Sequence, residues 1–368
     1  MKYNFLRKFV VLATIAAVFA LQSCSDDDDA PVVKRGEAGF FIVNEGAFQH
    51  SNTSISFYDR TTNTVANDIY KLKNGQPLGD QAQSMTVIDG KGYIVVQGSG
   101  KIEVIDANDY SAITTITEGI FSPRYIVQVS ATKAYVSDWG ADANTGTIKI
   151  LDLTTNKITG SIDDIGIGTN RFLKVGSGVY VVNSGSYAGN DNTVIALNSA
   201  TDAITGTIEV GDNPNSIVID NTTNIWVSNT GDVHYQSEPP YGIDEAASTA
   251  GSLTRLKTDL KVDFELSAPS VTDYGINNLV VSTDGKQLYY IFNSAIYTMS
   301  TSATKLPTTP FKEAAAYYGL AIDPFDGSLI ACKSPTFTAA GSIDIIDANG
   351  TVKNTFATGI APNGCAFK

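Results

Sequence analysis

The sequence predicts an all-β protein, a seven-bladed β-propeller whose ring is closed by the C-terminal strand joining the N-terminal blade. An internal repeat recurs along the chain at a period of about 40 to 50 residues, which is typical of propeller blades. Within each repeat, apolar and polar residues alternate with many β-branched and aromatic side chains, as expected of strands. The last strand-like segment also supplies the strand that the first repeat lacks.

The first 23 residues have the pattern of an export signal. Three basic residues precede an apolar run from Phe9 to Leu21, which is too short to span a membrane as a helix. The run ends at Leu21-Gln22-Ser23-Cys24, which resembles a bacterial lipobox, where the signal is cut before a cysteine that then carries the lipid. We expect residues 1–23 to be a lipoprotein signal peptide and Cys24 to be lipidated. The alternative is a secretory signal followed by an unrelated cysteine.

Residues 24–37 are expected to form a lipidated acidic tether. Ser25 is followed by four aspartates, a run too polar to fold alone. Placed directly after the lipid-bearing cysteine, it also resembles the export signal of Bacteroides-group surface lipoproteins. The expected location is therefore the outer membrane at the cell surface, held by the lipid anchor alone.

The charge of the mature chain disfavours nucleic acid as a partner. Of 25 Lys and Arg, three lie in residues 1–23, which leaves 22 against 38 Asp and Glu, a formal charge of −16. Phosphate backbones bind surfaces of the opposite sign. The two remaining cysteines, Cys332 and Cys365, lie in apolar stretches and are expected to be small core residues, with a disulfide between them left open.

Seven repeats each contain an apolar strand with a following partner strand. The second strands of the blades are expected at Phe40–Asn44, Gly92–Val96, Ala134–Ser137, Val179–Asn183, Ile225–Asn229, Leu288–Asn293 and Leu329–Cys332. The third strands are expected at Ser54–Asp59, Lys101–Asp106, Thr147–Asp152, Thr193–Asn198, Ser252–Lys257, Ala295–Ser300 and Ser342–Asp347. Most third strands are followed by Thr, Asn or Asp, which favour turns.

The C-terminal segment is expected to close the ring. In other repeats a first strand such as Pro123–Val127 or Pro214–Val218 precedes the second strand, yet the first repeat begins directly at Phe40. The missing pattern appears at Pro362–Phe367. Pairing of the two chain ends would leave no open sheet between the first and last blades, so residues 38–368 form one domain.

One face of this propeller is expected to carry the ligand site. Loops from second to third strand and loops from blade to blade lie on the same face, and they hold most of the unusual residues. The candidate ligand-binding residues are Phe48, His50, Phe121, Arg124, Trp139, Arg171, Tyr187, Tyr235, Tyr241, Tyr274, Asn277, Tyr317 and Phe337. Aromatic rings beside a few hydrogen-bonding groups suit a mid-sized organic ligand. The alternative is that individual aromatics only pack between blades. The insertion at residues 231–251 is the best candidate for a covering or partner-contacting loop.

The residue types predict no catalytic centre and no metal site. The only histidines, His50 and His234, are expected on blades one and five, so that joint metal ligation would require long loops to bend across the mouth. No Cys-Xaa-Xaa-Cys, phosphate-binding loop or Gly-Xaa-Ser-Xaa-Gly motif occurs, and the loop carboxylates follow no 12-residue calcium pattern. We therefore expect a binding protein without a catalytic cofactor.

The motif Phe40-Phe41-Ile42-Val43-Asn44-Glu45-Gly46, followed by Ser54–Asp59, resembles surface lipoproteins of the YncE-like propeller superfamily from Bacteroides-group bacteria. The BtuG-like cobalamin-binding members are the most similar. The resemblance implies capture of cobalamin (vitamin B12) or related corrinoids and transfer to a BtuB-like TonB-dependent outer-membrane transporter. Arg124 and Arg171 would then face the ligand's phosphate. A glycan- or protein-binding propeller and a lactonase-like hydrolase are the alternatives.

Overall fold

The structure is a computed structural model of the 368-residue chain, and it describes residues 36–239, 241–257, 259–273 and 275–368. The predicted signal peptide, the lipidation at Cys24 and the aspartates of the tether lie outside these ranges, as does Tyr274. Within the described ranges, no helix has the length and apolar character that crossing a membrane requires.

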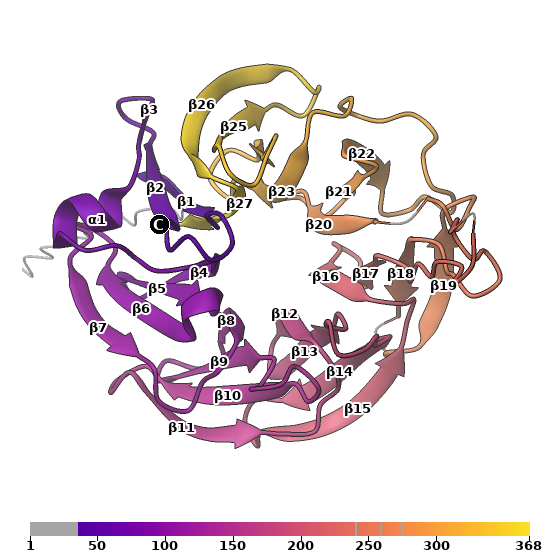
Figure 1. Cartoon of the computed structure of the whole chain (residues 1–368), viewed down its shortest axis with the longest axis horizontal. Helices are drawn as coiled ribbons and strands as arrows, with labels where there is room; N and C mark the ends of the chain where they lie inside the picture. Colours follow the sequence, from indigo (N-terminus) through magenta and orange to yellow (C-terminus); the bar gives the residue numbers. More distant parts are fainter. Residues whose placement is uncertain (1–35, 240, 258, 274) are drawn as a thin grey trace, which may run out of the picture. The chain divides into compact units, whose positions relative to one another are not determined.

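The described chain forms seven antiparallel sheets arranged in a ring, which confirms the predicted seven-bladed propeller (Figure 1). From the channel outward, blade one contains β27 (Pro362–Phe367), β1 (Gly39–Asn44), β2 (Ser54–Asp59) and β3 (Thr64–Ala66). Blade two contains β4 (Ala82–Ile88), β5 (Lys91–Val96), β6 (Lys101–Asp106) and β7 (Ala112–Ile116). Blade three contains β8 (Pro123–Gln128), β9 (Lys133–Asp138), β10 (Thr147–Asp152) and β11 (Lys157–Ile162).

The remaining blades follow the same order. Blade four contains β12 (Thr169–Val175), β13 (Gly178–Asn183), β14 (Thr193–Asn198) and β15 (Ala203–Glu209). Blade five contains β16 (Pro214–Ile219), β17 (Ile225–Asn229), β18 (Ser252–Leu256) and β19 (Val262–Ser267). Blade six contains β20 (Asn277–Val281), β21 (Gln287–Phe292) and β22 (Ala295–Ser300), and blade seven contains β23 (Tyr317–Ile322), β24 (Leu329–Lys333), β25 (Ala340–Ile346) and β26 (Val352–Ile360). Two short helical segments, α1 (Ile69–Asn74) and η1 (Gln97–Ser99), lie in connections.

Blade six has three strands rather than the four of the repeat. The chain after β22 meets that strand only through an isolated bridge between Ile296 and Lys312. Two prolines, Pro307 and Pro310, interrupt this stretch. Proline has no backbone N–H to donate to a strand ladder, so a regular fourth strand does not form here.

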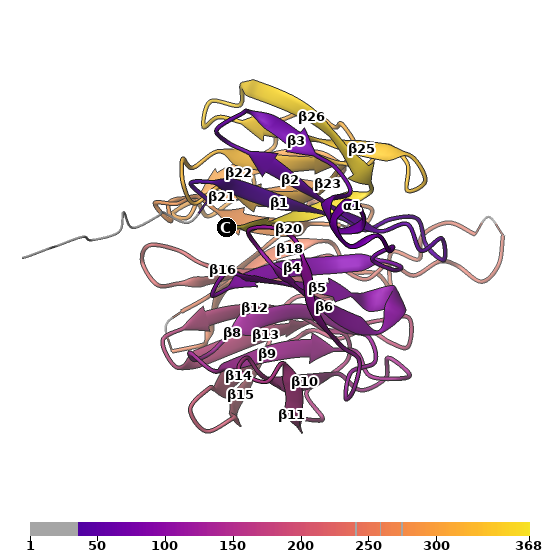
Figure 2. The same ribbon diagram turned by 90° about the vertical axis from the view of Figure 1, so that its left-hand side faces the viewer.

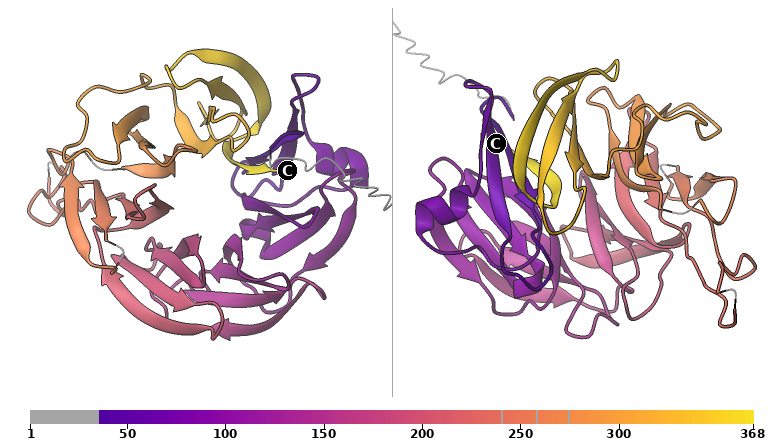
Figure 3. Two further views of the ribbon diagram at one scale, coloured as in Figure 1. Left: turned by 180° about the vertical axis from the view of Figure 1, so that it is seen from behind. Right: turned by 45° about the horizontal axis from the view of Figure 1, so that its top comes forward.

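The predicted ring closure is confirmed. β27 pairs antiparallel with β1, from Phe40 opposite Phe367 to Asn44 opposite Pro362, and so supplies the innermost strand of blade one (Figure 3). Both cysteines of the propeller, Cys332 in β24 and Cys365 in β27, are free thiols packed in the core at this seam. The pKa of the Cys365 thiol is raised, most strongly by a hydrogen bond to Cys332 and then by burial.

The hydrophobic core is divided among the gaps between neighbouring blades. In β1, Phe40 packs toward Ile330 of blade seven, whereas Phe41 packs toward Met85 and Ile94 of blade two. Each second strand is thus covered on both faces, which explains why these strands appear in the sequence as continuous apolar runs instead of strict alternation. Burial of both faces of the blades is the main source of stability in this fold.

One face of the disc is fastened by side chains that reach from one blade to the next. The Tyr93 hydroxyl donates to Asn156 Oδ1 at 2.9 Å, and the Tyr135 hydroxyl donates to Asp202 in the same way. At the seam, Arg60 forms ion pairs with Asp323 and, at 3.0 Å, with Asp326 of blade seven. We call this face, which carries the turns from first to second and from third to fourth strand, the latch face.

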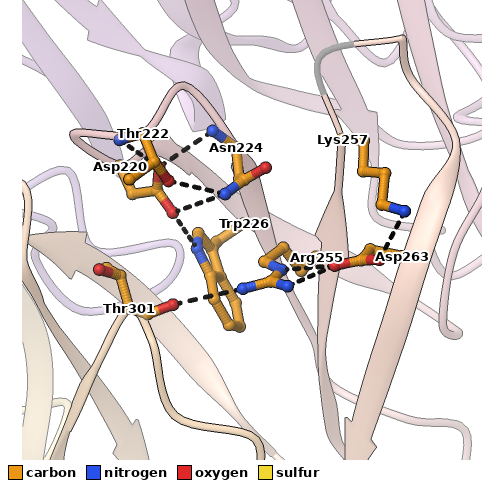
Figure 4. Close-up of polar contacts among 8 residues, drawn as sticks. All are labelled: Asp220, Thr222, Asn224, Trp226, Arg255, Lys257, Asp263 and Thr301. Atoms are coloured by element: carbon orange, nitrogen blue, oxygen red, sulfur yellow. Dashed lines mark hydrogen bonds and ion pairs between the residues drawn. The ribbon is translucent and has the colours of Figure 1, made fainter.

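Blade five has a further network on this face, formed mainly within the blade (Figure 4). The Trp226 indole donates to Asp220 Oδ2 at 3.0 Å, and Asp220 also accepts backbone N–H bonds from its own turn. Arg255 stacks on Phe264 at 4.1 Å and pairs with Asp263. The charges on the latch face are therefore used to hold turns and strands together.

Candidate functional site

Each innermost strand has a register shift near its first residues, where the chain enters from the face opposite to the latch face. A bulge at such a position redirects a side chain away from the regular alternation. The redirected and adjoining side chains line a cavity of about 140 Å³ at the centre of the ring, formed by Gln83, Tyr125, Asn170, Arg171, Asn215, Ser216, Asn277, Asn278, Tyr318 and Asn363. We call it the channel cavity. All ten of these residues have side chains with a polar group.

Amide side chains in the channel form hydrogen bonds that join neighbouring blades. Asn363 Nδ2 donates to the backbone oxygens of Ala82 and Gln83 at 3.1 and 3.2 Å, which joins blade one to blade two. Asn278 Nδ2 likewise donates to the Tyr318 oxygen of the next blade at 3.0 Å. The abundance of asparagine at the bulges therefore has a structural cause, and only the remaining polar atoms are free to meet a ligand.

Arg171 crosses the channel. From β12 in blade four, its guanidinium stacks on Tyr125 of blade three at 4.7 Å and donates to Asn278 Oδ1 of blade six at 3.2 Å. It also lines a second cavity, of about 120 Å³, that shares Gln83, Tyr125 and Asn363 with the channel cavity. Arg171 thus forms part of the partition between the two cavities.

A second arginine lies close by on β8. The Arg124 guanidinium stacks on the Trp139 ring at 4.0 Å. Arg124 Nε and the Trp139 indole nitrogen are both buried and have no hydrogen-bond partner within the described part of the chain. Burial is the largest influence on the pKa of Arg124 and lowers it, while the nearby Glu45 and Tyr318 oppose the shift.

Glu45 is the acidic member of this group, and it was not among the site residues predicted from the sequence. The Tyr318 hydroxyl donates to Glu45 Oε2 at 2.6 Å, and Gln81 Nε2 donates to Oε1 at 3.4 Å. Burial raises the pKa of the Glu45 carboxyl, whereas the Tyr318 hydrogen bond and the Arg124 charge lower it in part. Burial, and then the Glu45 charge, raise the pKa of Tyr318. Glu45 lies within the opening motif, but nothing in that motif marks it as channel-facing.

Exposed aromatic side chains lie on the loops of the face opposite to the latch face, which we call the loop face. Six of the predicted residues lie there and keep between 53% and 83% of their surface exposed: Phe48, Phe121, Tyr187, Tyr235, Tyr241 and Phe337. We call these six residues the aromatic rim. The Phe337 ring meets Tyr318 edge-on at 4.9 Å, which connects the rim to the channel.

The insertion between β17 and β18 is a folded hairpin rather than an open loop. Tyr235 and Ile243 form a β-bridge within it. Asp232 accepts hydrogen bonds from Asn190 Nδ2 at 2.6 Å and pairs with His234 at 2.7 Å, so the hairpin docks on the neighbouring β13–β14 loop. Figure 2 shows it projecting on the same side of the disc as the β1–β2 loop.

The structure separates the predicted site residues into three groups. Arg124, Trp139, Arg171 and Asn277 lie in or beside the channel, and the aromatic rim and the exposed His50 lie on loops of the loop face. Tyr317 is largely buried in the core between blades six and seven, in one cluster with Tyr289, and it borders a side cavity of about 500 Å³ beside Asn277 rather than the channel cavity. Because consecutive strand residues face different ways, it is the next residue, Tyr318, that reaches the channel cavity.

No group of three or more His, Cys, Asp or Glu residues that could hold a metal ion occurs among the described residues. His50 and His234 belong to loops of blades one and five, as expected. The His50 ring meets the Phe48 backbone oxygen at 2.7 Å, and His234 is engaged by Asp232. The two imidazoles are therefore held by different local partners.

Solved structures with the same fold come from several functional classes. A quinonprotein alcohol dehydrogenase-like protein from Bacteroides thetaiotaomicron is 16% identical over 91% of this chain and 79% of its own, with a TM-score of 0.62. A candidate 6-phosphogluconolactonase from Bacteroides fragilis is 12% identical over 90% and 99% of the two chains, with a TM-score of 0.62. Hydrazine synthase from Kuenenia stuttgartiensis is 15% identical over 87% and 96%, with a TM-score of 0.60. At these identities the likeness concerns the fold alone.

Among curated proteins, none matches the sequence. A family model does match, and it spans residues 38–359, nearly the whole propeller. The chain belongs to the family described as a domain of unknown function, DUF5074.

Proposed function

We propose that this propeller is a cell-surface capture protein that binds cobalamin or a related corrinoid on its loop face, as BtuG-like lipoproteins do. The observation that carries the proposal is the combination of the aromatic rim on the loop face with the channel cavity, which the contact between Phe337 and Tyr318 connects. A broad ligand with an apolar ring and a polar fringe matches such a surface, because the ring meets aromatic faces while the fringe meets amides and guanidinium groups.

The charges near the channel favour the same ligand class. Arg124 and Arg171 are the cationic groups closest to the channel, and Glu45 already accepts hydrogen bonds from Tyr318 and Gln81. A guanidinium group binds phosphate oxygens through paired hydrogen bonds. The single phosphate of cobalamin is therefore a fitting partner for one of these arginines, although the chain as a whole is acidic.

The position of the chain ends supports surface capture. The described chain begins at Gly36, whose backbone nitrogen bonds the C-terminal Lys368 oxygen on the latch face. A lipid anchor at Cys24 would join the propeller on that face and leave the aromatic rim unobstructed. Transfer of the ligand to a TonB-dependent outer-membrane transporter is the next step of the proposal.

Titration calorimetry with cyanocobalamin and cobinamide tests the proposal. We expect saturable binding of both corrinoids at one site per chain, with weaker binding of cobinamide because it lacks the nucleotide phosphate ester and base. Absence of heat with both ligands would rule out corrinoid capture. In that event, a glycan array tests the alternative binding function, and hydrolysis of sugar lactones tests the alternative enzyme.

A further inference from the structure

A larger cavity adjoins the channel cavity at the loop-face end of blade six. This side cavity has a volume of about 500 Å³ and shares Asn277, Asn278 and Tyr318 with the channel cavity. Its volume is in the range of about 300–1,000 Å³ that is usual for small-molecule sites, whereas the channel cavity of about 140 Å³ holds only a small group. A ligand that uses both cavities would therefore place a small group in the channel cavity and its body in the side cavity.

The short turn of blade six accounts for the side cavity. The connection between β21 and β22 consists of Asn293 and Ser294 alone, both at positive φ (49° and 59°), as in a two-residue hairpin turn. The corresponding connection of blade five runs from residue 230 to residue 251. Asn293 and Ser294 are exposed and line the side cavity. Blade six thus lacks a loop that would cover its own end.

Two side chains of the channel cavity have donor groups without an acceptor among the described residues. Arg171 forms one hydrogen bond, to Asn278 Oδ1 at 3.2 Å, and no ion pair within the described part of the chain. Its other N–H groups remain, and its guanidinium stays charged. The Tyr125 oxygen accepts a bond from Gln83 Nε2 at 2.9 Å, so its own proton is still to be donated. Both residues line the channel cavity and present donors to a guest that accepts hydrogen bonds.

The charges around these donors favour an anion over a neutral acceptor. The chain has 38 acidic residues, yet none of the described residues that line the channel cavity or the side cavity is acidic. Glu45 lies nearby, but Tyr318 and Gln81 already donate to its carboxylate. Burial lowers the pKa of Arg124 most, and the charge of Arg171 lowers it further, because like charges repel. An anion bound at Arg171 would relieve this repulsion.

We propose that the channel cavity and the side cavity form one site for an anionic ligand, with its carboxylate or phosphate on Arg171 and Tyr125 and its body in the side cavity. The preference for an anion rests on these two cavities alone. Its application to corrinoids rests on the proposed function. In that case the anion is the phosphate of the cobalamin nucleotide, and the corrin ring remains on the loop face outside the cavities.

Benzoate, benzamide and acetate separate the two parts of the site. Benzoate and benzamide have the same shape and differ in charge, whereas acetate has the charge without the body. Each is titrated into the isotope-labelled protein while the arginine Nε–H and asparagine side-chain amide signals are followed by NMR. We expect saturable shifts with benzoate, and binding at least about tenfold weaker for benzamide and for acetate, a difference of about 1.4 kcal/mol.

Each other outcome overturns a stated part of the proposal. Benzamide that binds as tightly as benzoate would show that the site does not select an anion. Acetate that binds as tightly as benzoate would show that the side cavity does not hold the body of the ligand. Absence of a saturable shift with benzoate would overturn the whole site.

Two matched variants assign the charge preference to Arg171. In Arg171→Met the guanidinium is lost but the length of the side chain is nearly retained, and we expect benzoate to lose its advantage over benzamide. The control is Arg255→Met on the latch face, since Arg255 also stacks on an aromatic ring and bonds a neighbouring blade. This control should prefer benzoate as the parent does. An unchanged preference in a folded Arg171→Met protein, checked by circular dichroism, contradicts the assignment.

A second pair of variants tests the side cavity. Thr272 is exposed and lines this cavity, so the larger ring in Thr272→Trp should fill part of it. We expect benzoate binding to weaken to the level of acetate, while acetate binding stays as in the parent and shows that the variant is folded. The control is Thr62→Trp, at an exposed position in a turn of the latch face. Equal benzoate binding in the two variants would exclude the side cavity from the site.

Cobalamin and cobinamide connect the site to the whole ligand, because cobinamide lacks the nucleotide and its phosphate ester. In Arg171→Met the affinity for cobalamin should fall about tenfold, whereas that for cobinamide should not change. If benzoate binds but neither corrinoid does, the proposed function fails and the anion site stands. If both corrinoids bind the parent and Arg171→Met equally well, phosphate recognition at Arg171 fails and corrinoid capture stands.

Discussion

Pairs of an arginine and an aromatic ring occur both on the latch face and in the channel of this propeller, but their hydrogen-bond partners differ. On the latch face, Arg255 stacks on Phe264 at 4.1 Å and is neutralised by Asp263. In the channel, Arg171 stacks on Tyr125 at 4.7 Å but its hydrogen-bond partner is the uncharged Asn278. In the first arrangement a carboxylate neutralises the arginine charge. In the second the partner is a neutral amide, so the arginine charge can still attract a ligand. The comparison indicates that a guanidinium–aromatic pair marks a site only where no carboxylate accompanies it.

Polar atoms without a hydrogen-bond partner also distinguish the channel side from the latch face. Trp226 on the latch side donates its indole N–H to Asp220, whereas the Trp139 indole under Arg124 has no acceptor within the described residues. The exposed aromatics are also divided, since the rim lies on the loop face and the exposed Phe325 beside Arg60 lies on the latch face. The unpartnered side-chain nitrogen of this pair of tryptophans thus lies away from the latch face.

Deletion of residues 362–368 is expected to have the largest effect, because it removes a strand shared by both faces. The deletion opens the pairing of β27 with β1 and exposes core residues such as Phe40. A loss of ~5 kcal/mol or more lowers Tm by at least about 7 °C in a domain of this size. Calorimetric melting measures it, and a deletion mutant that melts with the parent would contradict closure by this strand.

A change confined to the latch face should lower stability without affecting the ligand. In Asp220→Ala, the Trp226 indole and the backbone N–H groups of the turn lose their acceptor. We expect the free energy of unfolding to fall by about 2–4 kcal/mol, as measured by chemical denaturation. Calorimetry on the folded mutant should give the corrinoid affinity of the parent. A loss of affinity comparable to that of a rim mutant would mean that the two faces are not separate.

A change confined to the aromatic rim should weaken corrinoid binding and leave the stability nearly unchanged. Tyr187 is 83% exposed, so Tyr187→Ala is expected to alter the free energy of unfolding by no more than about 0.5 kcal/mol. Corrinoid affinity should fall by about tenfold, as for loss of an aromatic contact at a binding surface. A suitable control is Tyr70→Phe, since Tyr70 is a buried aromatic of the core that lies away from the rim. Unaltered affinity in Tyr187→Ala would remove this residue from the site.

The sequence was sufficient for the architecture and for only part of the site. Repetition reveals the blades because every second strand has the same burial on both faces, and β17 was predicted with its observed bounds, Ile225–Asn229. The bulges could not be predicted, because they shift a side chain by one position with no change in composition. That shift decides between Tyr317, which is in the core, and Tyr318, which lines the channel. Glu45 was missed for a related reason, since its partner Tyr318 lies 273 residues away in the chain.

The smallest expected effect concerns the pH dependence of stability and depends on Glu45. Its pKa is raised above the ordinary value of 4.5 chiefly by burial, so the folded state holds the proton more tightly than the unfolded state. The resulting stabilisation is full below pH 4.5 and is lost as the pH rises through the folded pKa. In Glu45→Gln this loss is absent, while the Tyr318 hydroxyl can still donate to the side-chain oxygen.

Unfolding of the parent and Glu45→Gln should therefore be compared between about pH 4 and pH 7. The stability of the variant relative to the parent should rise with pH, by at most about 1 kcal/mol. A matched control is Glu118→Gln, because Glu118 is exposed on the same face and should show no such trend. A variant whose relative stability falls with rising pH would show that Arg124 and Tyr318 stabilise the carboxylate more than burial destabilises it. Glu45 would then be a carboxylate stabilised by its partners, like the carboxylates of the latch face, and not a group whose charge remains unpaired in the channel.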